Sequence, residues 1–178
     1  MICDRIKECC QEQFDDGKAV TCANRPKNCI ISSDRRTRVK CEENKKKYVL
    51  VNSRRNQIIS YKIDGGAIVT DCNVPEGTRK CDYMFVINGE ERTAIITELK
   101  GVNVRDSLKQ LANTLTLFES FFQSLPRVYA RAVVAASIPD IKAEPSYVNL
   151  RRKLQRYNGN VKILKSQWEE LDTELNTL

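Results

Sequence analysis

The chain has 178 residues, of which 41% are hydrophobic and 30% are charged, and its formal net charge is +7. This length suits one domain with its own core, and no apolar run approaches the roughly 20 residues that a membrane helix needs. The chain contains no histidine, which excludes Ser-His-Asp and Cys-His catalysis as well as His-ligated zinc hydrolases. Any catalysis would depend on carboxylates, lysine, tyrosine, cysteine or a hard metal ion.

The N-terminal region is rich in cysteine and weakly periodic. Its opening, "MICDRIKECCQEQFDD", is charged throughout and lacks the apolar core of a signal peptide, so we expect a cytoplasmic protein with reduced thiols. We interpret residues 1–46 as a cysteine-rich arm or cap. Its cysteines leave one alternative open, a zinc site, although no C-x2-C pair occurs among the four residues concerned: Cys9, Cys10, Cys22 and Cys29.

Strand patterns dominate the chain from about residue 47, where we place the start of an α/β domain extending to residue 178. Alternating or continuous apolar runs, separated by turn-forming residues such as Asp64-Gly65-Gly66, predict five strands in succession. The strands are expected at 48–52, 57–63, 67–70, 81–87 and 94–100.

Helical periodicity follows. One apolar face, formed by Leu108, Leu111, Leu115, Phe118 and Phe122, predicts a helix over about 104–123. The remaining elements are expected to be a buried strand within 127–137, a helix at 146–157, a strand at 160–165 and a helix at 166–175 with a capping-box start. This order predicts a mixed α/β fold with one central sheet flanked by helices.

Two acids and a lysine stand at the ends of two successive predicted strands. Glu98 and Lys100 share a strand face with Ala94 and Ile96, because side chains alternate along a strand. A hairpin loop centred on Glu90 would pair residues whose numbers sum to 180. Asp82 would then lie opposite Glu98 and point to the same side of the sheet.

A rival register exists. Asn88-Gly89 is a strong signal for a two-residue hairpin turn. A tight turn there would pair residues summing to 177 and send Asp82 and Glu98 to opposite faces. Only a longer odd-numbered loop, or a bulge, would let the two acids meet.

Two facing carboxylates favour a divalent cation, since they otherwise repel each other and lose hydration. Their oxygens suit Mg²⁺ or Mn²⁺, which polarises a phosphate and lowers the pKa of a bound water. Lys100 beside the ion would orient that water or stabilise charge on the phosphate. The residue types and their pattern therefore point to phosphodiester hydrolysis.

The segment "CDYMFVINGEERTAIITELK" resembles the core of the PD-(D/E)XK nuclease superfamily, with cysteine where the name has proline. The resemblance implies a restriction-endonuclease-like fold in which a helix and a strand follow the motif. It implies that Asp82 and Glu98 bind the metal, that the Leu99 carbonyl adds a ligand, and that Lys100 acts on the attacking water.

Two further site residues are expected from the same resemblance. Asp64 is favoured over Glu42 and Glu43 as an additional metal-binding acid. Gln110 on the following helix is expected to take part in catalysis, although position 114 is threonine where some branches have tyrosine. No cysteine follows Cys81, which argues against the iron–sulfur cluster of other branches.

The leading hypothesis is a Mg²⁺- or Mn²⁺-dependent endonuclease that acts on DNA rather than RNA, without a membrane partner. A homodimer is expected, since cutting both strands of a duplex needs two sites. The basic charge fits a nucleic-acid partner. Two alternatives remain open: a catalytically silent nucleic-acid-binding module of the same fold, and an interaction protein organised by zinc on the N-terminal cysteines.

Overall fold

The computed structural model describes residues 2–18, 29–66, 74–75, 77–99, 103–135 and 140–177. The elements in chain order are α1 (Ile2–Cys10), the π-helical turn η1 (Gln11–Asp15), β1 (Ile30–Asp34), β2 (Arg38–Glu43), β3 (Lys46–Val51), β4 (Gln57–Lys62), β5 (Tyr83–Asn88), β6 (Thr93–Leu99), α3 (Val104–Leu117), α4 (Glu119–Phe122), β7 (Arg127–Val134), α5 (Pro145–Gln155), β8 (Val161–Lys165) and β9 (Trp168–Leu171).

The central layer is a six-stranded mixed sheet in the order β1-β4-β5-β6-β7-β8. The first four strands in that order pair antiparallel, whereas β6, β7 and β8 run parallel to one another. Helices α3 and α5 lie in the two connections between the parallel strands, as parallel pairing requires. The carboxyl ends of β6, β7 and β8 therefore lie side by side at one end of the sheet.

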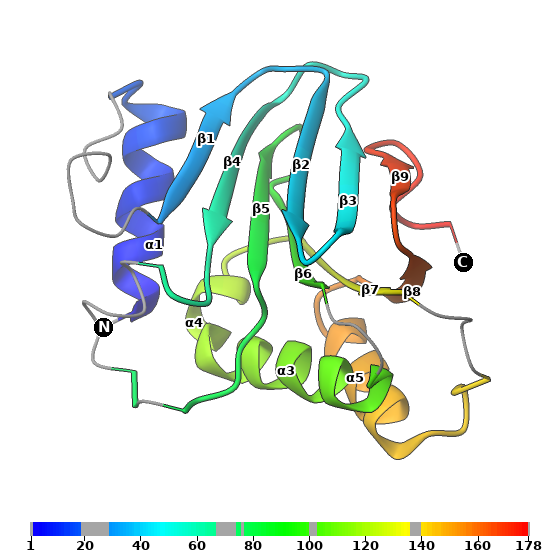
Figure 1. Cartoon of the computed structure of the whole chain (residues 1–178). Coiled ribbons are helices and arrows are strands. Elements are labelled where there is room, and N and C mark those ends of the chain that lie inside the picture. The colour runs from blue at the N-terminus through cyan, green and yellow to red at the C-terminus, as the bar shows by residue number, and fades with distance from the viewer. Residues whose placement is uncertain are drawn as a thin grey trace.

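Each face of this sheet is covered by a different layer. The even-numbered residues Met84 and Val86 of β5 pack with α1, α3, α4 and α5 in one apolar cluster. The odd-numbered Phe85 and Ile87 pack against the small sheet β2-β3-β9 in a second cluster. The molecule thus has three layers: helices, the six-stranded sheet and the three-stranded sheet (Figure 1).

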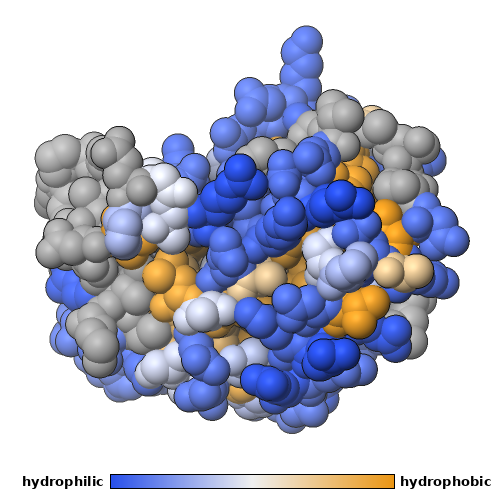
Figure 2. Space-filling view, turned by 90° about the horizontal axis from the view of Figure 1, so that it is seen from below, coloured by the Kyte–Doolittle hydropathy of each residue, from blue (hydrophilic) through white to orange (hydrophobic). Residues whose placement is uncertain are grey.

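The helix layer presents a largely hydrophilic outer surface with small apolar areas (Figure 2). Helix α3 buries Leu108, Leu111 and Leu115, and the Asn103 side chain caps its start by accepting from the Asp106 N–H. Helix α5 begins at Pro145, a residue that suits the first helical turn. Within the described ranges, no helix combines the length and the apolar character that crossing a membrane would demand.

A buried ion pair joins β7 of the large sheet to β9 of the small one. Glu170 Oε2 accepts from Arg131 Nε at 2.7 Å, and the arginine side chain is 0% exposed. Glu170 also accepts from Tyr48 Oη (2.7 Å) and from Lys162 Nζ (2.9 Å). Arg131 donates further bonds to the Leu175 carbonyl and to Asn160 Oδ1. Because both charged groups have several partners, their burial is offset by hydrogen bonds.

Most of the predicted elements are confirmed, with shifts of a few residues at their ends. The predicted strand at 67–70 lies outside the described residues. The predicted helix over 166–175 is wrong, because Trp168–Leu171 form β9, which pairs parallel to β3. Tertiary pairing and the burial of Glu170 override the local capping pattern at Ser166. Strands β1 and β2 carried no clear pattern in the sequence.

The N-terminal region contributes strands to both sheets. Strand β1 pairs with β4 at the edge of the large sheet, and β2 pairs with β3 in the small one. The boundary expected between residues 46 and 47 falls inside the β2–β3 hairpin, where Glu43 pairs with Lys46. Helix α1 is tied to the same domain by a bond from Lys7 Nζ to Ser120 Oγ of α4 (3.0 Å).

We expect Glu170→Gln to lower the free energy of unfolding by about 3–5 kcal/mol, because it leaves the buried Arg131 charge without its counter-ion. Urea unfolding at neutral pH measures the change. Glu169→Gln is the matched control: Glu169 is exposed and paired with Arg38, and its loss should cost less than about 1 kcal/mol. Equal losses in the two variants would contradict the role assigned to the ion pair.

The Arg131–Glu170 pair should also make the free energy of unfolding depend on pH. Burial alone would raise the pKa of Glu170, but its bonds to Arg131, Lys162 and Tyr48 outweigh burial and lower that pKa below its usual 4.5. The stabilisation is therefore present above pH 4.5 and is lost as the pH falls through the lower folded-state value. Unfolding curves of the wild type and Glu170→Gln should converge in that acidic range and stay apart at neutral pH.

Candidate active site

The β5–β6 hairpin has the register that brings two acids to one end of the sheet. Met84 pairs with Ile96 and Val86 with Ala94, so paired residue numbers sum to 180. Five residues, 88–92, separate the last pair, Ile87 and Thr93, and a tight turn at Asn88-Gly89 does not form. Asp82 directly precedes β5. Glu98 directly follows Thr97, the last residue of β6 that pairs with β5. The predicted register is confirmed.

Glu98 lies inside the fold, in a strand whose seven residues are all buried. Its side chain is 0% exposed, and its Oε1 accepts a hydrogen bond of 2.6 Å from Gln110 Nε2. Gln110, on the buried face of α3, donates a second bond to the Lys80 carbonyl at 3.1 Å. The glutamine therefore fixes the orientation of the Glu98 carboxylate and links it to the segment that leads into β5.

Asp82 is held by backbone groups of neighbouring strands. Its Oδ2 accepts from the Leu99 N–H at 2.7 Å, so its carboxylate lies at the end of β6. The Asp82 carbonyl accepts from the N–H groups of Ile63 (2.9 Å) and Asp64 (3.4 Å), just after β4. These bonds place the aspartate where β4, β5 and β6 come together.

Thr114 and Cys81 form the support beneath the two acids. Thr114 Oγ1 accepts from the Cys81 N–H at 2.8 Å and donates to the Gln110 carbonyl at 2.8 Å. Burial raises the pKa of the Cys81 thiol, a bond from Thr114 opposes this, and the charges of Glu98 and Asp82 raise it further. The charges of both carboxylates therefore act on the same thiol.

The sequence reasoning treated Thr114 only as a departure from a family pattern. Its structural role follows from its position, because residues four apart on a helix lie on the same face. Gln110 and Thr114 therefore face the sheet together, and both bond to the peptide group between Lys80 and Cys81: Gln110 donates to its carbonyl, and Thr114 accepts from its N–H. This spacing was the signal that could have identified Thr114.

The Asp64 side chain does not join the two acids, although the Asp64 N–H bonds to the Asp82 carbonyl. Its side chain is 60% exposed, and its Oδ1 is 2.8 Å from Lys80 Nζ. Across the described ranges, no group of three or more acidic, cysteine or histidine side chains is arranged to hold a metal ion. The structure therefore does not bring Asp64 into one cluster with Asp82 and Glu98, and the same holds for Glu42, which pairs with Lys40, and for Glu43.

Lys100 lies outside the described residues, so its predicted place beside the acids stays a prediction. The zinc site that the sequence left open as an alternative is only partly described, because Cys22 is outside the described residues too. Cys10 is buried near Tyr61, with Sγ and Oη 3.5 Å apart. Burial raises the pKa of the Cys10 thiol to about 12.

A cavity of about 470 Å³ opens beside Gln110. It is lined by Asp64, Gly77, Thr78, Arg79, Lys80, Asp106 and Gln110. Its two cations are matched by acids, since Arg79 lies 3.4 Å from Asp106 and Lys80 bonds to Asp64. Gln110 therefore stands between this polar cavity and the buried Glu98 carboxylate.

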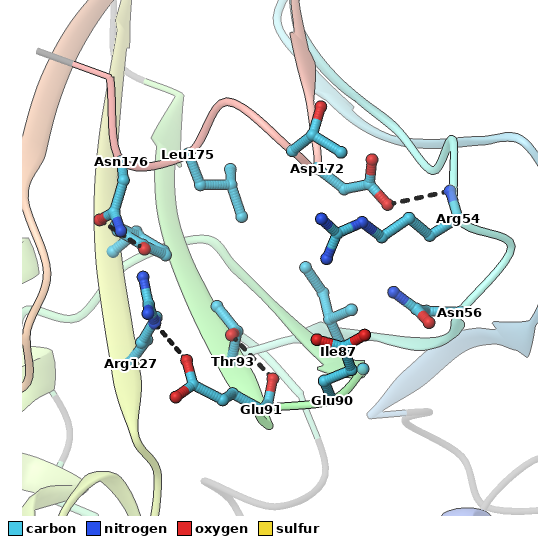
Figure 3. A pocket seen from close by; sticks show the side chains of 13 residues that line it. Arg54, Asn56, Ile87, Glu90, Glu91, Thr93, Arg127, Asp172, Leu175 and Asn176 are labelled. Carbon is cyan, nitrogen blue, oxygen red and sulfur yellow. Dashed lines mark hydrogen bonds and ion pairs between the residues drawn. The ribbon is translucent and has the colours of Figure 1, made fainter.

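A second polar cavity, of about 420 Å³, lies at the opposite end of the sheet (Figure 3). It is bounded by the β5–β6 loop and the segment after β9. Arg127 bonds to Glu91, and the Asp172 carboxylate accepts from the Arg54 backbone N–H. The first bond joins the hairpin loop to β7, the second joins the β3–β4 loop to the segment after β9, and neither involves Asp82 or Glu98. We therefore do not place the candidate active site in this cavity.

No protein-family model, curated protein or solved structure matches the chain. The function is therefore inferred from the geometry of the site.

We expect Thr114→Val to lower the free energy of unfolding by about 1–3 kcal/mol, because it leaves the buried Cys81 N–H without an acceptor at nearly unchanged volume. Thr114→Ser keeps the hydroxyl and should retain most of the stability. Chemical unfolding of both variants measures the difference. Equal losses in the two variants would contradict the stabilising role assigned to the Thr114 hydroxyl, since only Thr114→Val removes it.

Proposed function

We propose that the protein is a metal-dependent nuclease that hydrolyses phosphodiester bonds, with DNA as its substrate. The observation that carries the proposal is the β5–β6 register, which sets Asp82 and Glu98 at the same end of the sheet. Each carboxylate is oriented by a separate donor, Leu99 N–H for Asp82 and Gln110 for Glu98. Paired, oriented carboxylates at the end of buried strands are a costly arrangement that a divalent cation would stabilise.

The available donor atoms suit a hard cation. Asp82 and Glu98 supply carboxylate oxygens, and Leu99 offers a third oxygen. In a β-strand, the N–H and C=O of one residue point to the same side, as in the bonded pairs of an antiparallel ladder. Since the Leu99 N–H reaches Asp82, its carbonyl also faces the Asp82 side. This oxygen set matches the preference of Mg²⁺ or Mn²⁺.

These residues have distinct proposed roles. Mg²⁺ or Mn²⁺ bound by Asp82, Glu98 and the Leu99 carbonyl would polarise the scissile phosphate and lower the pKa of a water. Gln110 keeps one Glu98 oxygen engaged, so the orientation of the carboxylate is set before substrate arrives. Lys100, next along the chain, would orient the attacking water or stabilise the negative charge that develops on the phosphate.

Topology and charge also support the proposal. An antiparallel β4-β5-β6 sheet followed by α3 and a parallel β7 is the order expected from the resemblance to PD-(D/E)XK nucleases. The net charge of +7 favours a polyanionic substrate. The homodimer expected for cutting both strands of a duplex remains part of the proposal.

A catalytically silent nucleic-acid-binding module is the second candidate. It is favoured by the exposed position of Asp64, which leaves two acids rather than three near the metal position in the described part of the chain. This candidate predicts salt-dependent binding to nucleic acid with no cleavage in Mg²⁺ or Mn²⁺.

We expect Glu98→Gln and Lys100→Ala each to reduce Mg²⁺- or Mn²⁺-dependent cleavage by at least about 100-fold, the scale at which electrostatic and acid–base groups contribute. Glu98→Gln keeps an acceptor oxygen for Gln110, so the fold should be retained. Cleavage is measured on single-stranded DNA, duplex DNA and RNA, with EDTA as the metal-free control.

Glu90→Ala provides the matched control, because Glu90 is exposed on the β5–β6 loop at the far end of the same hairpin. Its cleavage rate should equal that of the wild type. Wild-type cleavage rates in both site variants would overturn the proposed mechanism, and metal-independent binding without any cleavage would favour the silent module.

A further inference from the structure

Strand β8 is an edge strand of the six-stranded sheet, with β7 as its neighbour on one side only. At the start of the parallel β7–β8 pairing, the Ala130 N–H donates to the Asn160 carbonyl at 2.9 Å. At its end, the Ser166 N–H donates to the Val134 carbonyl at 2.9 Å. Because backbone groups alternate in direction along a strand, the even-numbered residues of β8 face β7. The N–H and C=O groups of the odd-numbered residues therefore point away from the sheet.

The outward-facing backbone groups of β8 are unpaired in the described part of the chain. They belong to Val161, Ile163 and Lys165, and no hydrogen bond within the described ranges involves them. A row of such groups along a sheet edge can pair with an extended peptide, which then becomes a further strand. Main-chain bonds provide affinity in this mode of recognition, and pockets for alternate side chains provide specificity.

A cavity of about 410 Å³ with largely apolar walls lies beside this edge. Its walls include Ile141 before α5, Tyr147 on α5, and Val161 and Ile163 of β8. All four side chains pack with the helix-side core cluster, so the cavity lies on that face of β8. Directly paired residues point to the same face of a sheet. A residue of an added strand opposite Ile163 would therefore direct its side chain toward this cavity.

The charge at this edge is mainly positive. Lys142 lines the cavity, and Lys165 follows Ile163 on the same face of β8, two residues further along the strand. Both lysines are exposed, and neither forms an ion pair in the part of the chain that the structure describes. Asp140 also lines the cavity, and its Oδ1 accepts from the Lys142 N–H at 3.4 Å. An acidic partner would complement the two lysines.

The order of residues on this face specifies the partner. Val161, Ile163 and Lys165 present two apolar side chains and then a cation. An antiparallel strand complements them with an acid followed by two apolar residues, at alternate positions. A second copy of β8 fits less well, because antiparallel pairing about Ile163 would set Lys165 opposite the apolar Val161 and supply no acid. Lysines on an edge strand also oppose the pairing of identical edges.

We propose that β8 and its cavity bind an extended acidic segment of another protein, which pairs antiparallel with β8 as a seventh strand of the large sheet. The apolar side chains of that segment lie at the cavity, and its carboxylate lies beside Lys165. The inference goes beyond the proposed nuclease function and does not rest on it, because neither Asp82 nor Glu98 takes part.

The test uses the full chain and a peptide of the specified pattern, acetyl-Thr-Glu-Thr-Val-Thr-Val-Thr-amide. Amide NMR spectra of the ¹⁵N-labelled protein are recorded during titration with this peptide. We expect saturable shifts centred on the amides of Val161, Ile163 and Lys165. These three amides should also exchange with solvent more slowly once the peptide is bound, because their N–H groups then have acceptors.

Two methylated peptides separate strand pairing from apolar contact. In the proposed pairing, the N–H of the first valine faces β8, whereas the N–H of the threonine after it faces solvent. N-methylation of that valine should weaken binding by about tenfold or more, the scale of one lost hydrogen bond. N-methylation of the threonine is the matched control and should have a much smaller effect.

Protein variants test the cavity and the charge. Ile163→Ala should weaken binding several-fold, whereas Ile31→Ala should not, since Ile31 is 51% exposed on β1 at the other edge of the large sheet. Lys165→Glu should weaken binding of the acidic peptide and favour a peptide with lysine in place of its glutamate. Lys109→Glu, on the exposed side of α3, is the control for net charge and should not reverse this preference.

The outcomes that would overturn the inference are distinct from those that concern catalysis. No saturable binding up to about 1 mM peptide, shifts away from β8, or equal effects of the two methylations would overturn it. So would sedimentation showing that the free protein dimerises and that Ile163→Ala abolishes the dimer, since a second copy would then occupy the edge. Peptide binding without DNA cleavage would support the inference while the proposed nuclease activity fails, and cleavage without peptide binding would do the opposite.

Discussion

The pairing register of β5 and β6 is the constraint on which the candidate site depends. In strands that alternate from face to face, a slip of one residue moves every side chain to the other side. The observed register sends Met84, Val86, Ala94 and Ile96 to the helix layer, and it brings Asp82 and Glu98 together at the end of that face. Core packing and the position of the acids are therefore set by the same pairing.

The acids are supported from the helix layer. Gln110 and Thr114, one turn apart on α3, bond to Glu98 and to the Cys81 N–H respectively. Helix α3 follows β6 in the chain and packs on the same sheet, so one connection positions both the strand end and its support. On the opposite side, the Arg131–Glu170 pair joins the two sheets and holds β9.

Much of this arrangement could be predicted from residue patterns. The apolar stripe of α3 and the buried strands follow local rules of periodicity, whereas the hairpin loop departs from the local turn signal at Asn88-Gly89. Strands β1 and β9 do not follow local rules, because their partners, β4 and β3, are distant in the chain. The sequence from Ser166 to Glu169 satisfies a helix-capping pattern, yet pairing with β3 and the buried bonds of Glu170 favour a strand.

The sequence by itself determined which chemistry is available: carboxylates and a lysine on adjacent strands, no histidine, and an excess of positive charge. It also narrowed the hairpin to two registers without deciding between them. Only the tertiary structure decided that register and left the exposed Asp64 side chain outside a cluster with Asp82 and Glu98. The physical reason is that residue type is a local property, whereas pairing register and the meeting of distant turns are determined by the packing of the whole core.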